Sequence, residues 1–176
     1  MSEKLNPQDT CVLVTGGAGF IGSHTVVELL QGGYQVVIVD DLSNSSPVAI
    51  DRIKQIVGDD AAANLKFYEN NVLDREALER IFTENKIDRV IHFAGFKAVG
   101  ESVHKPVEYY HNNIESTLVL VDVMRNHGCK SIVFSSSATV YGDPDELPVT
   151  EESPKKFATN PYGWTKWMIE QMLTDL

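Results

Sequence analysis

Cysteine, basic side chains and long apolar runs are all scarce in this 176-residue sequence. Its two cysteines, Cys11 and Cys129, each stand at the start of an apolar run. We expect both to be buried, reduced thiols, because such cysteines usually pack as small hydrophobic residues. No apolar run approaches the roughly 20 residues that a membrane-spanning helix needs, and the polar N-terminal segment lacks the apolar core of a secretory signal. A soluble, cytoplasmic protein is expected.

Positive charge is scarce as well. Lys and Arg number 15 against 25 Asp and Glu, which gives a net charge of −10, and the acidic residues are spread along the chain. Binding to nucleic acid or to an anionic membrane surface needs clustered Lys and Arg, so we expect neither as a partner. The five histidines show no metal-binding spacing such as H-E-x-x-H, and no metal site is predicted.

What the sequence does contain is a regular alternation of short apolar runs with helix-length segments. The runs predict strands at 11–16, 35–40, 65–69, 89–94 and 131–136. The intervening segments predict helices at 20–33, at 48–57, from Asp74 to about Asn85 and from Pro161. A further long helix is predicted to follow a short irregular stretch around Pro106 and to end at 126–128. Strands that are nearly all apolar indicate a parallel sheet covered on both faces. Right-handed crossovers then favour a doubly wound α/β fold of strand order 3-2-1-4-5.

The segment "VLVTGGAGFIGSH" joins the first strand to the first helix. Its glycines fit G-x-G-x-x-G from Gly17, or G-x-x-G-x-x-G from Gly16, both with Gly19 and Gly22. Glycines in this place permit a tight turn, close approach of a diphosphate, and close packing of helix on strand. The helix N-terminus behind them offers N–H groups to the diphosphate. The sequence therefore predicts a dinucleotide site at the carboxyl ends of the strands.

An acidic residue follows at the expected place. Asp40 closes the second strand, 18 residues after Gly22, where a carboxylate would accept hydrogen bonds from a ribose diol. Asp41 comes next, and no Arg or Lys occurs before Arg52. A 2′-phosphate would be repelled there, so NAD is favoured over NADP. For Asp41, a solvated loop carboxylate is an equally open interpretation.

Hydroxyl groups and a Tyr–Lys pair complete the candidate site. "SSSATVYG" follows the fifth strand, and Ser137, 25 residues before Tyr162, is its best candidate, whereas Ser135 and Ser136 could equally satisfy turn backbone. Tyr162 and Lys166 are four apart, so they share one helix face. A phenol with a pKa of about 10 is a poor base at neutral pH, but a neighbouring ammonium ion favours its phenolate form. Such a phenolate can take a proton from an alcohol while hydride leaves for NAD.

The segments "TGGAGFIGSH", "HFAGFKAVGES", "SSSATVYGD" and "NPYGWTK" together resemble the UDP-glucose 4-epimerases (UDP-galactose 4-epimerases) of the extended short-chain dehydrogenase/reductase family. The resemblance implies an NAD-dependent isomerase of galactose metabolism that interconverts UDP-galactose and UDP-glucose through a 4-keto sugar. It implies that Tyr162 takes the proton of the sugar 4-hydroxyl, that Ser137 hydrogen-bonds the reacting oxygen, and that Lys166 holds the nicotinamide ribose. It also implies a homodimer, through the helix ending near Asn126 and the helix beginning at Tyr162.

The same resemblance implies a set of ligand contacts. Cofactor contacts are expected from Gly16, Gly19, Phe20, Ile21, Gly22, Asp40, Asp41, Leu42, Ser43, Asn44, Ser45, Asn71, Val72, Phe93, Ala94, Gly95, Phe96, Lys97, Asn112, Ser137, Tyr162 and Lys166. Substrate contacts are expected from Lys97, Ser137, Thr139 and Tyr162. Residues 1–176 would thus form an NAD-binding Rossmann domain that carries the catalytic residues, with the substrate-binding domain lying outside this chain.

Besides Phe96, which stands where Leu is usual, and Trp164, which replaces a polar residue, two departures from the family pattern bear on function. Asn71 stands where the family usually has an Asp that accepts a hydrogen bond from the adenine amino group, and we expect weaker NAD binding from this change. Members of the family are also longer than this chain, so a fragment that binds NAD without turnover is one alternative. A dehydratase or decarboxylase of nucleotide sugars is another, although a dehydratase would be expected to carry an acidic pair where Ala138 and Thr139 follow Ser137.

Overall fold

The computed structural model describes residues 6–176, and the chain divides into two compact units. The first unit runs to Ala94 and resumes over Val119–Val133, while the second comprises Gly95–Leu118 and Phe134–Leu176. The predicted glycine loop therefore belongs to the first unit, and the predicted Tyr–Lys pair belongs to the second.

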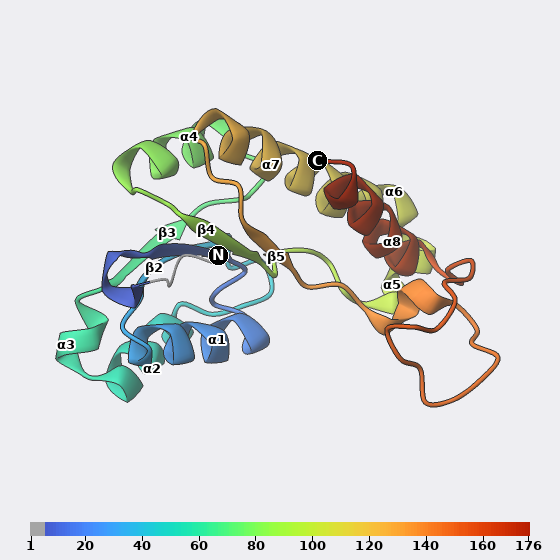
Figure 1. Cartoon of the computed structure of the whole chain (residues 1–176), viewed down its shortest axis with the longest axis horizontal. Coiled ribbons are helices and arrows are strands. Elements are labelled where there is room, and N and C mark those ends of the chain that lie inside the picture. The colour runs from blue at the N-terminus through green and yellow to red at the C-terminus, as the bar shows by residue number, and fades with distance from the viewer. Residues whose placement is uncertain (1–5) are drawn as a thin grey trace. The chain divides into compact units, whose positions relative to one another are not determined.

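The first unit is built on a five-stranded sheet (Figure 1). In chain order the elements up to Ala94 are η1 (Pro7–Asp9), β1 (Cys11–Thr15), α1 (Phe20–Gln31), β2 (Gln35–Asp40), α2 (Val48–Val57), α3 (Asp59–Ala62), β3 (Leu65–Glu69), α4 (Arg75–Glu84) and β4 (Arg89–His92). Helix α7 (Ser116–Asn126) enters this unit at Val119 and leads to β5 (Ile132–Phe134). The strand order is β3-β2-β1-β4-β5, and β1 pairs in parallel with both β2 and β4. This confirms the predicted doubly wound sheet.

Each face of this sheet is covered by helices and forms its own hydrophobic core. Side chains alternate between the faces along a strand, so Leu13 of β1 lies in one core and Val14 in the other. Helices α4 and α7 cover the first core, to which α4 contributes Ile81. Helices α1 and α2 cover the second, to which they contribute Val26 and Ile53. Figure 1 shows these two helix layers above and below the strands.

Several local predictions are confirmed. Cys11 and Cys129 are buried free thiols in the core under α4 and α7. Helix α4 begins where the sequence predicted, because the Asp74 carboxylate accepts a hydrogen bond of 3.0 Å from the Ala77 N–H, as an N-cap does.

Three strands are shorter than predicted: β1 ends at Thr15, one residue early, and β4 and β5 differ more. β4 ends at His92 instead of residue 94, and β5 covers Ile132–Phe134 instead of 131–136. After β4, Gly95 has a φ of +149°, which extended strand residues do not adopt. After β5, the Ser135 carbonyl accepts a hydrogen bond of 2.8 Å from Lys166 Nζ, so the chain turns away from the ladder.

The prediction of an irregular stretch around Pro106 is wrong. Helix α5 (Val99–His104) and helix α6 (Pro106–Tyr110) occupy it, with Pro106 in the first turn of α6, where a missing N–H costs nothing. A π-helical turn (His111–Glu115) then joins α6 to α7, so the predicted long helix is interrupted. One-turn helix α3 was not predicted either. Helices this short carry too few residues to show a periodic pattern.

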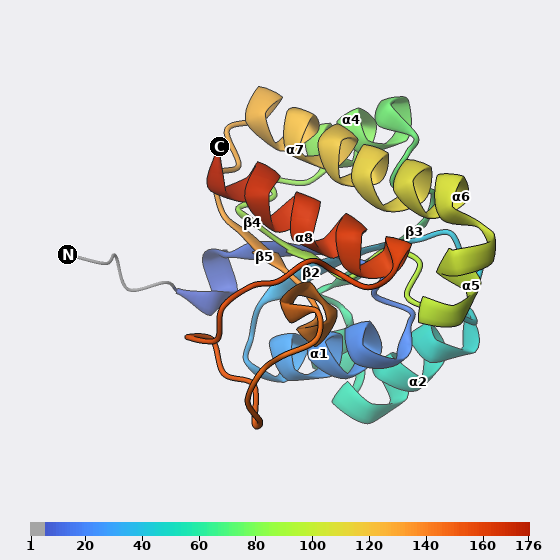
Figure 2. The same cartoon turned by 90° about the vertical axis from the view of Figure 1, so that its right-hand side faces the viewer.

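The second unit gathers helices around α8 (Pro161–Thr174). Helices α5 and α6 contact α8, as does the 3₁₀ turn η3 (Ala138–Tyr141); Figure 2 shows α8 from its side. Helix α8 begins at Pro161, as predicted, and the side chain of Asn160 caps it by accepting 2.8 Å from the Gly163 N–H. This cap fixes the first turn of the helix that carries the Tyr–Lys pair.

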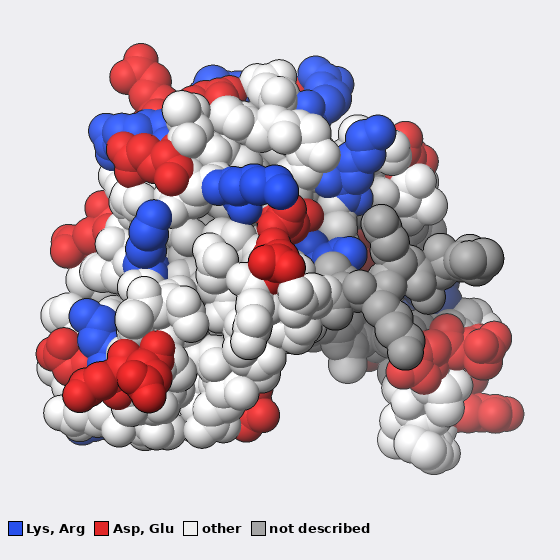
Figure 3. Space-filling model, turned by 60° about the vertical axis from the view of Figure 1, so that its left-hand side comes forward, with Lys and Arg blue, Asp and Glu red and all other residues white. Residues whose placement is uncertain are grey.

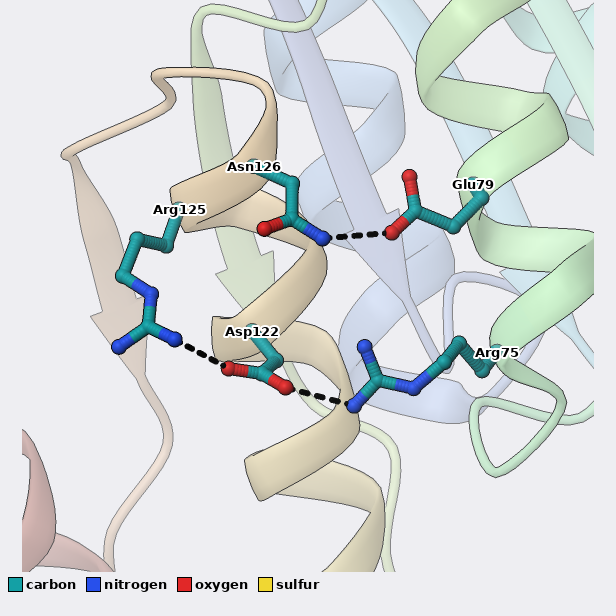
Figure 4. A network of polar contacts seen from close by, with 5 residues as sticks. All are labelled: Arg75, Glu79, Asp122, Arg125 and Asn126. Carbon is teal, nitrogen blue, oxygen red and sulfur yellow. Dashed lines mark hydrogen bonds and ion pairs between the residues drawn. The ribbon is translucent and has the colours of Figure 1, made fainter.

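The surface carries mixed charge. On the face drawn in Figure 3, acidic and basic side chains are interspersed and the visible Lys and Arg form no continuous patch. In the first unit, Arg75 of α4 and Arg125 of α7 both bind the Asp122 carboxylate, at 2.7 and 3.1 Å, and Asn126 donates to Glu79 at 2.8 Å (Figure 4). Exposed pairs of this kind contribute about 0–1 kcal/mol each, so the network fixes the register of α7 on α4 more than it stabilises the fold. Within residues 6–176, no helix combines the length and apolar character needed to cross a membrane.

Candidate functional site

The glycine loop of the first unit is closely packed. A Cβ atom on Gly22 would lie 2.2 Å from the Gly16 carbonyl oxygen and 2.8 Å from the Gly17 Cα. Gly16 has a φ of +69°, and a Cβ atom there would lie 2.8 Å from the Ala94 nitrogen. The loop therefore requires glycine at both positions. Gly19 is the N-cap residue of α1, and no side-chain hydrogen bond caps this helix start. The N–H groups of the first turn are therefore suited to binding an anion.

Asp40 is fixed by the loops on either side of it. Its side chain is 8% exposed, and one carboxylate oxygen accepts 2.9 Å from the Ala18 N–H. The other oxygen accepts from the Leu42 N–H at 3.0 Å and from the Ser45 hydroxyl at 2.8 Å. A carboxylate can accept about four hydrogen bonds, so one position remains for a ribose hydroxyl.

The loop after β2 is held in an unusual conformation. Leu42 has a φ of +57°, in the left-handed region that residues other than glycine seldom adopt. Asp41 accepts 2.7 Å from the Asn71 side-chain amide, whose oxygen in turn accepts 2.8 Å from the Leu73 N–H. The two residues that sequence analysis considered separately thus form one hydrogen-bonded pair, which joins the ends of β2 and β3.

The apolar residues predicted to contact the cofactor differ in exposure. Phe20 and Ile21, at the start of α1, are 76% and 58% exposed. Val72 is instead buried in the core under α4 and α7, so its side chain is not exposed to a ligand. Phe93 and Ala94 pack against the cores on opposite faces of the sheet. Phe20 and Ile21 are therefore the most exposed of these apolar residues.

The Tyr–Lys pair lies in the second unit, on α8. Tyr162 and Lys166 are both buried, and Lys166 Nζ lies 5.9 Å from the centroid of the Tyr162 ring. The ammonium group also lies 4.6 Å from the centroid of the Phe134 ring and donates to the Ser135 carbonyl. The spacing of four along the helix places both side chains on one face, and the Ser135 carbonyl accepts the hydrogen bond of the lysine.

The three serines have different roles in this geometry. Ser137 Oγ accepts from the Thr139 N–H at 3.2 Å and from the Thr139 hydroxyl at 2.9 Å, and so caps η3. Ser135 contributes its carbonyl to Lys166. Ser136 Oγ is buried, with no hydrogen-bond partner among the described residues. Ser137 and Thr139, both predicted as substrate contacts, therefore lie side by side.

Sequence reasoning missed Asn113, which anchors the loop after β4. Asn113 is 2% exposed; its amide accepts 2.8 Å from the Phe96 N–H and donates 3.0 Å to the Phe96 carbonyl. The same amide donates 3.1 Å to the Thr165 hydroxyl on α8. Asn112, which was predicted as a cofactor contact, donates to the Asn113 side chain. The only sequence signal was an Asn–Asn doublet. The sequence did not predict the π-helical turn on which both asparagines lie.

Burial lowers the pKa of Lys166 to about 8, from an ordinary value of 10.5. The unfolded chain therefore binds more protons between these two pH values, and the free energy of unfolding should rise with pH across that window. At about 1.4 kcal/mol per pH unit, the rise from this residue is on the order of 3 kcal/mol.

We expect Lys166→Met to remove this rise. The free energy of unfolding, measured by urea denaturation at pH 7 and pH 10, should increase less in Lys166→Met than in the wild type. Lys130, an exposed lysine, supplies the control, because Lys130→Met should follow the wild type. An equal change in the free energy of unfolding between pH 7 and pH 10 in all three proteins would show that burial of Lys166 does not affect stability.

Comparison with known proteins places both units in one family. A family model described as GDP-mannose 4,6 dehydratase matches residues 13–176. The chain is 59% identical over 165 residues to a UDP-glucose 4-epimerase of Bacillus subtilis, covering 94% of this chain and 47% of that protein. A UDP-glucose 4-epimerase of Haemophilus influenzae is also 59% identical over 164 residues, covering 93% of this chain and 47% of that protein.

Solved structures give the same result. The crystal structure of a UDP-glucose 4-epimerase from Bifidobacterium longum in complex with NAD⁺ and UDP is similar at a TM-score of 0.90 and 60% identity, covering 94% of this chain and 48% of that one. That of a UDP-glucose 4-epimerase from Brucella ovis in complex with NAD is similar at a TM-score of 0.82 and 39% identity, covering 94% of this chain and 47% of that one. The chain thus spans about half the length of these relatives.

Proposed function

The chain belongs to the extended short-chain dehydrogenase/reductase family, and from this we propose that its protein is a UDP-glucose 4-epimerase. It would interconvert UDP-galactose and UDP-glucose with bound NAD. The observation that carries the proposal is the buried Tyr162–Lys166 pair on α8, in a chain 60% identical to an epimerase solved with NAD⁺ and UDP.

The first unit fits the cofactor. Glycine is required at Gly16 and Gly22, and the uncapped start of α1 suits a diphosphate. Asp40 has a remaining acceptor position for a ribose hydroxyl, and the Asp41–Asn71 pair offers further polar groups. When bound, NAD would supply an acceptor and donor of hydride.

Tyr162 would act as the base that takes the proton of the sugar 4-hydroxyl and later returns it. Lys166 lies on the same helix face, with its Nζ 5.9 Å from the centroid of the Tyr162 ring, so a positive charge is held close to the reacting group. Ser137 would hydrogen-bond the reacting oxygen with its hydroxyl proton, because Ser137 Oγ itself accepts from Thr139 and is free to donate elsewhere. These residues together hold and move one proton at the C4 oxygen.

A cytoplasmic homodimer is part of the proposal. Large apolar side chains are exposed on the helices expected to pair: Val107 of α6 is 74% exposed, Leu118 of α7 is 52% exposed and Met168 of α8 is 37% exposed. Burying such side chains against a second copy would remove apolar area from water at about 25 cal/mol per Å². We therefore include a homodimer of this protein in the proposal.

The test uses the protein expressed from its complete reading frame and purified without added NAD. We expect it to convert UDP-galactose into UDP-glucose and to release NAD when denatured. A 4-keto-6-deoxy product would instead identify a dehydratase. Release of NAD without sugar conversion would identify a protein that only binds the dinucleotide.

A further inference from the structure

Tyr109 is the most enclosed aromatic residue of the second unit and is absent from the predicted site. It lies on α6 and is 1% exposed. Its hydroxyl accepts 3.1 Å from the Ala98 N–H, and it lies 3.0 Å from the Ala98 carbonyl and 2.9 Å from the Glu101 carboxylate, to either of which it can donate. One side-chain oxygen thus engages both backbone groups of Ala98.

The Tyr109 hydroxyl is kept in its donor form. Burial and then the hydrogen bond to Glu101 raise the pKa of Tyr109 above its ordinary value of 10. Glu101 is itself held by Lys105 at 3.0 Å. The Tyr109 ring packs at 5.4 Å, centroid to centroid, against the Phe96 ring. Contacts at the ring and at the hydroxyl therefore fix this side chain in one position.

Lys97 lies between two anchored residues. On one side, Asn113 binds both backbone groups of Phe96. On the other, the Tyr109 hydroxyl accepts from the Ala98 N–H and lies within hydrogen-bond distance of the Ala98 carbonyl. The side chain of Lys97 is itself exposed. A flexible lysine on a rigid backbone is well suited to meeting an anionic ligand at a defined place.

We propose that Tyr109 is a positioning residue that fixes the backbone of Lys97 for contact with the nucleotide ligands. This inference rests on the proposed function, in which Lys97 contacts the cofactor and the UDP-sugar. Loss of the Tyr109 hydroxyl would free the Ala98 backbone groups and let the loop sample other positions. A misplacement of about 1 Å in a catalytic site can cost about 100-fold in rate.

The variant Tyr109→Phe removes one oxygen atom and keeps the ring against Phe96. Tyr68→Phe is its matched control: the Tyr68 hydroxyl also binds a carboxylate and an N–H, those of Glu84 and Asn85, but it lies on β3 outside both sites. In the protein from the complete reading frame, we expect kcat/KM for UDP-galactose to fall about tenfold in Tyr109→Phe. Tyr68→Phe should stay within about twofold of the wild type.

A double-mutant cycle tests whether Tyr109 acts through Lys97. Lys97→Ala should lower kcat/KM by itself, and adding Tyr109→Phe to it should cause no further loss. A general structural role would make the two losses multiply, and that result would overturn the proposal. Activity equal to the wild type in Tyr109→Phe alone would overturn it as well.

Hydrogen exchange of the Ala98 amide gives a readout that needs no turnover. Exchange should be faster in Tyr109→Phe than in the wild type and in Tyr68→Phe, because the Ala98 N–H loses its acceptor. Unchanged exchange at Ala98 overturns the anchoring. If the wild type does not epimerise while Ala98 exchange still depends on Tyr109, the proposed function fails and the anchoring of the loop stands.

Discussion

Tyr162→Phe is expected to lower kcat for UDP-galactose conversion by about 10²- to 10⁴-fold, the contribution typical of a positioned general base. The substitution removes only the phenol oxygen, so the ring can keep its buried place on α8 beside Lys166. Without that oxygen, α8 loses the group proposed to take the proton of the 4-hydroxyl. Steady-state kinetics with the protein from the complete reading frame would measure the loss.

The matched control for this variant is Tyr34→Phe. Tyr34 packs against the core under α1 and α2, and it belongs to neither candidate site. Tyr34→Phe should keep wild-type turnover, and both variants should unfold within a few degrees of the wild type. Full activity in Tyr162→Phe would exclude this tyrosine as the base and leave α8 with a structural role.

Gly22→Ala is expected to cause the largest loss of NAD binding from a single added methyl group. The new Cβ would overlap the Gly16 carbonyl oxygen, at 2.2 Å, and approach the Gly17 Cα at 2.8 Å. Both are backbone atoms of the glycine loop, which must shift to make room. Overpacking of this kind costs about 1–3 kcal/mol, which corresponds to roughly a 5- to 150-fold weaker affinity if the loop moves from its binding geometry.

Gly100→Ala is the control for the added methyl group. A Cβ atom at Gly100, on α5, would meet nothing within 4 Å. Alanine in a helix is more favourable than glycine by about 0.5–1 kcal/mol, so Gly100→Ala should leave NAD affinity unchanged and stability equal or higher. The amount of NAD that co-purifies per chain, measured after denaturation, would compare the three proteins. Equal NAD content in Gly22→Ala and Gly100→Ala would contradict the assignment of the dinucleotide site.

The doubly wound sheet could be predicted because its signals are local. The runs that became β1 and β2 are mostly apolar and bounded by turn residues, and a parallel order follows from the helices between the strands. The Tyr162–Lys166 pair could be predicted for a similar reason, since a spacing of four on a helix determines a shared face. The short helices α5 and α6 lacked any such periodicity and were missed.

The supporting contacts could not be predicted because they join residues far apart in the chain. The Asp40 carboxylate was expected as an open ligand for ribose, yet it also holds the Ala18 N–H and the Ser45 hydroxyl. Asn113 and Tyr109 reach back across a turn to the loop after β4. Composition and spacing cannot predict such a contact, because only the folded chain brings the side chain close to its backbone partner.

Asn71, which departs from the family pattern, has a hydrogen-bond partner in the structure. The resemblance to the family predicts weaker NAD binding, because an amide stands where the family usually has a carboxylate. The structure places the Asp41 carboxylate 2.7 Å from the Asn71 amide nitrogen. Negative charge is therefore present at this edge of the sheet, on the neighbouring residue. The expectation of weaker binding stays a prediction, and titration of Asn71→Asp with NAD would measure it.

The most direct test of the proposed function follows the hydrogen on C4 of the sugar. UDP-galactose labelled with deuterium at C4 would be converted in ordinary water by the protein from its complete reading frame, and the product examined by NMR. The account predicts UDP-glucose that keeps the deuterium at C4, because the hydrogen removed there returns to the same carbon from the bound cofactor. Loss of the label to solvent, or no conversion at all, would contradict it.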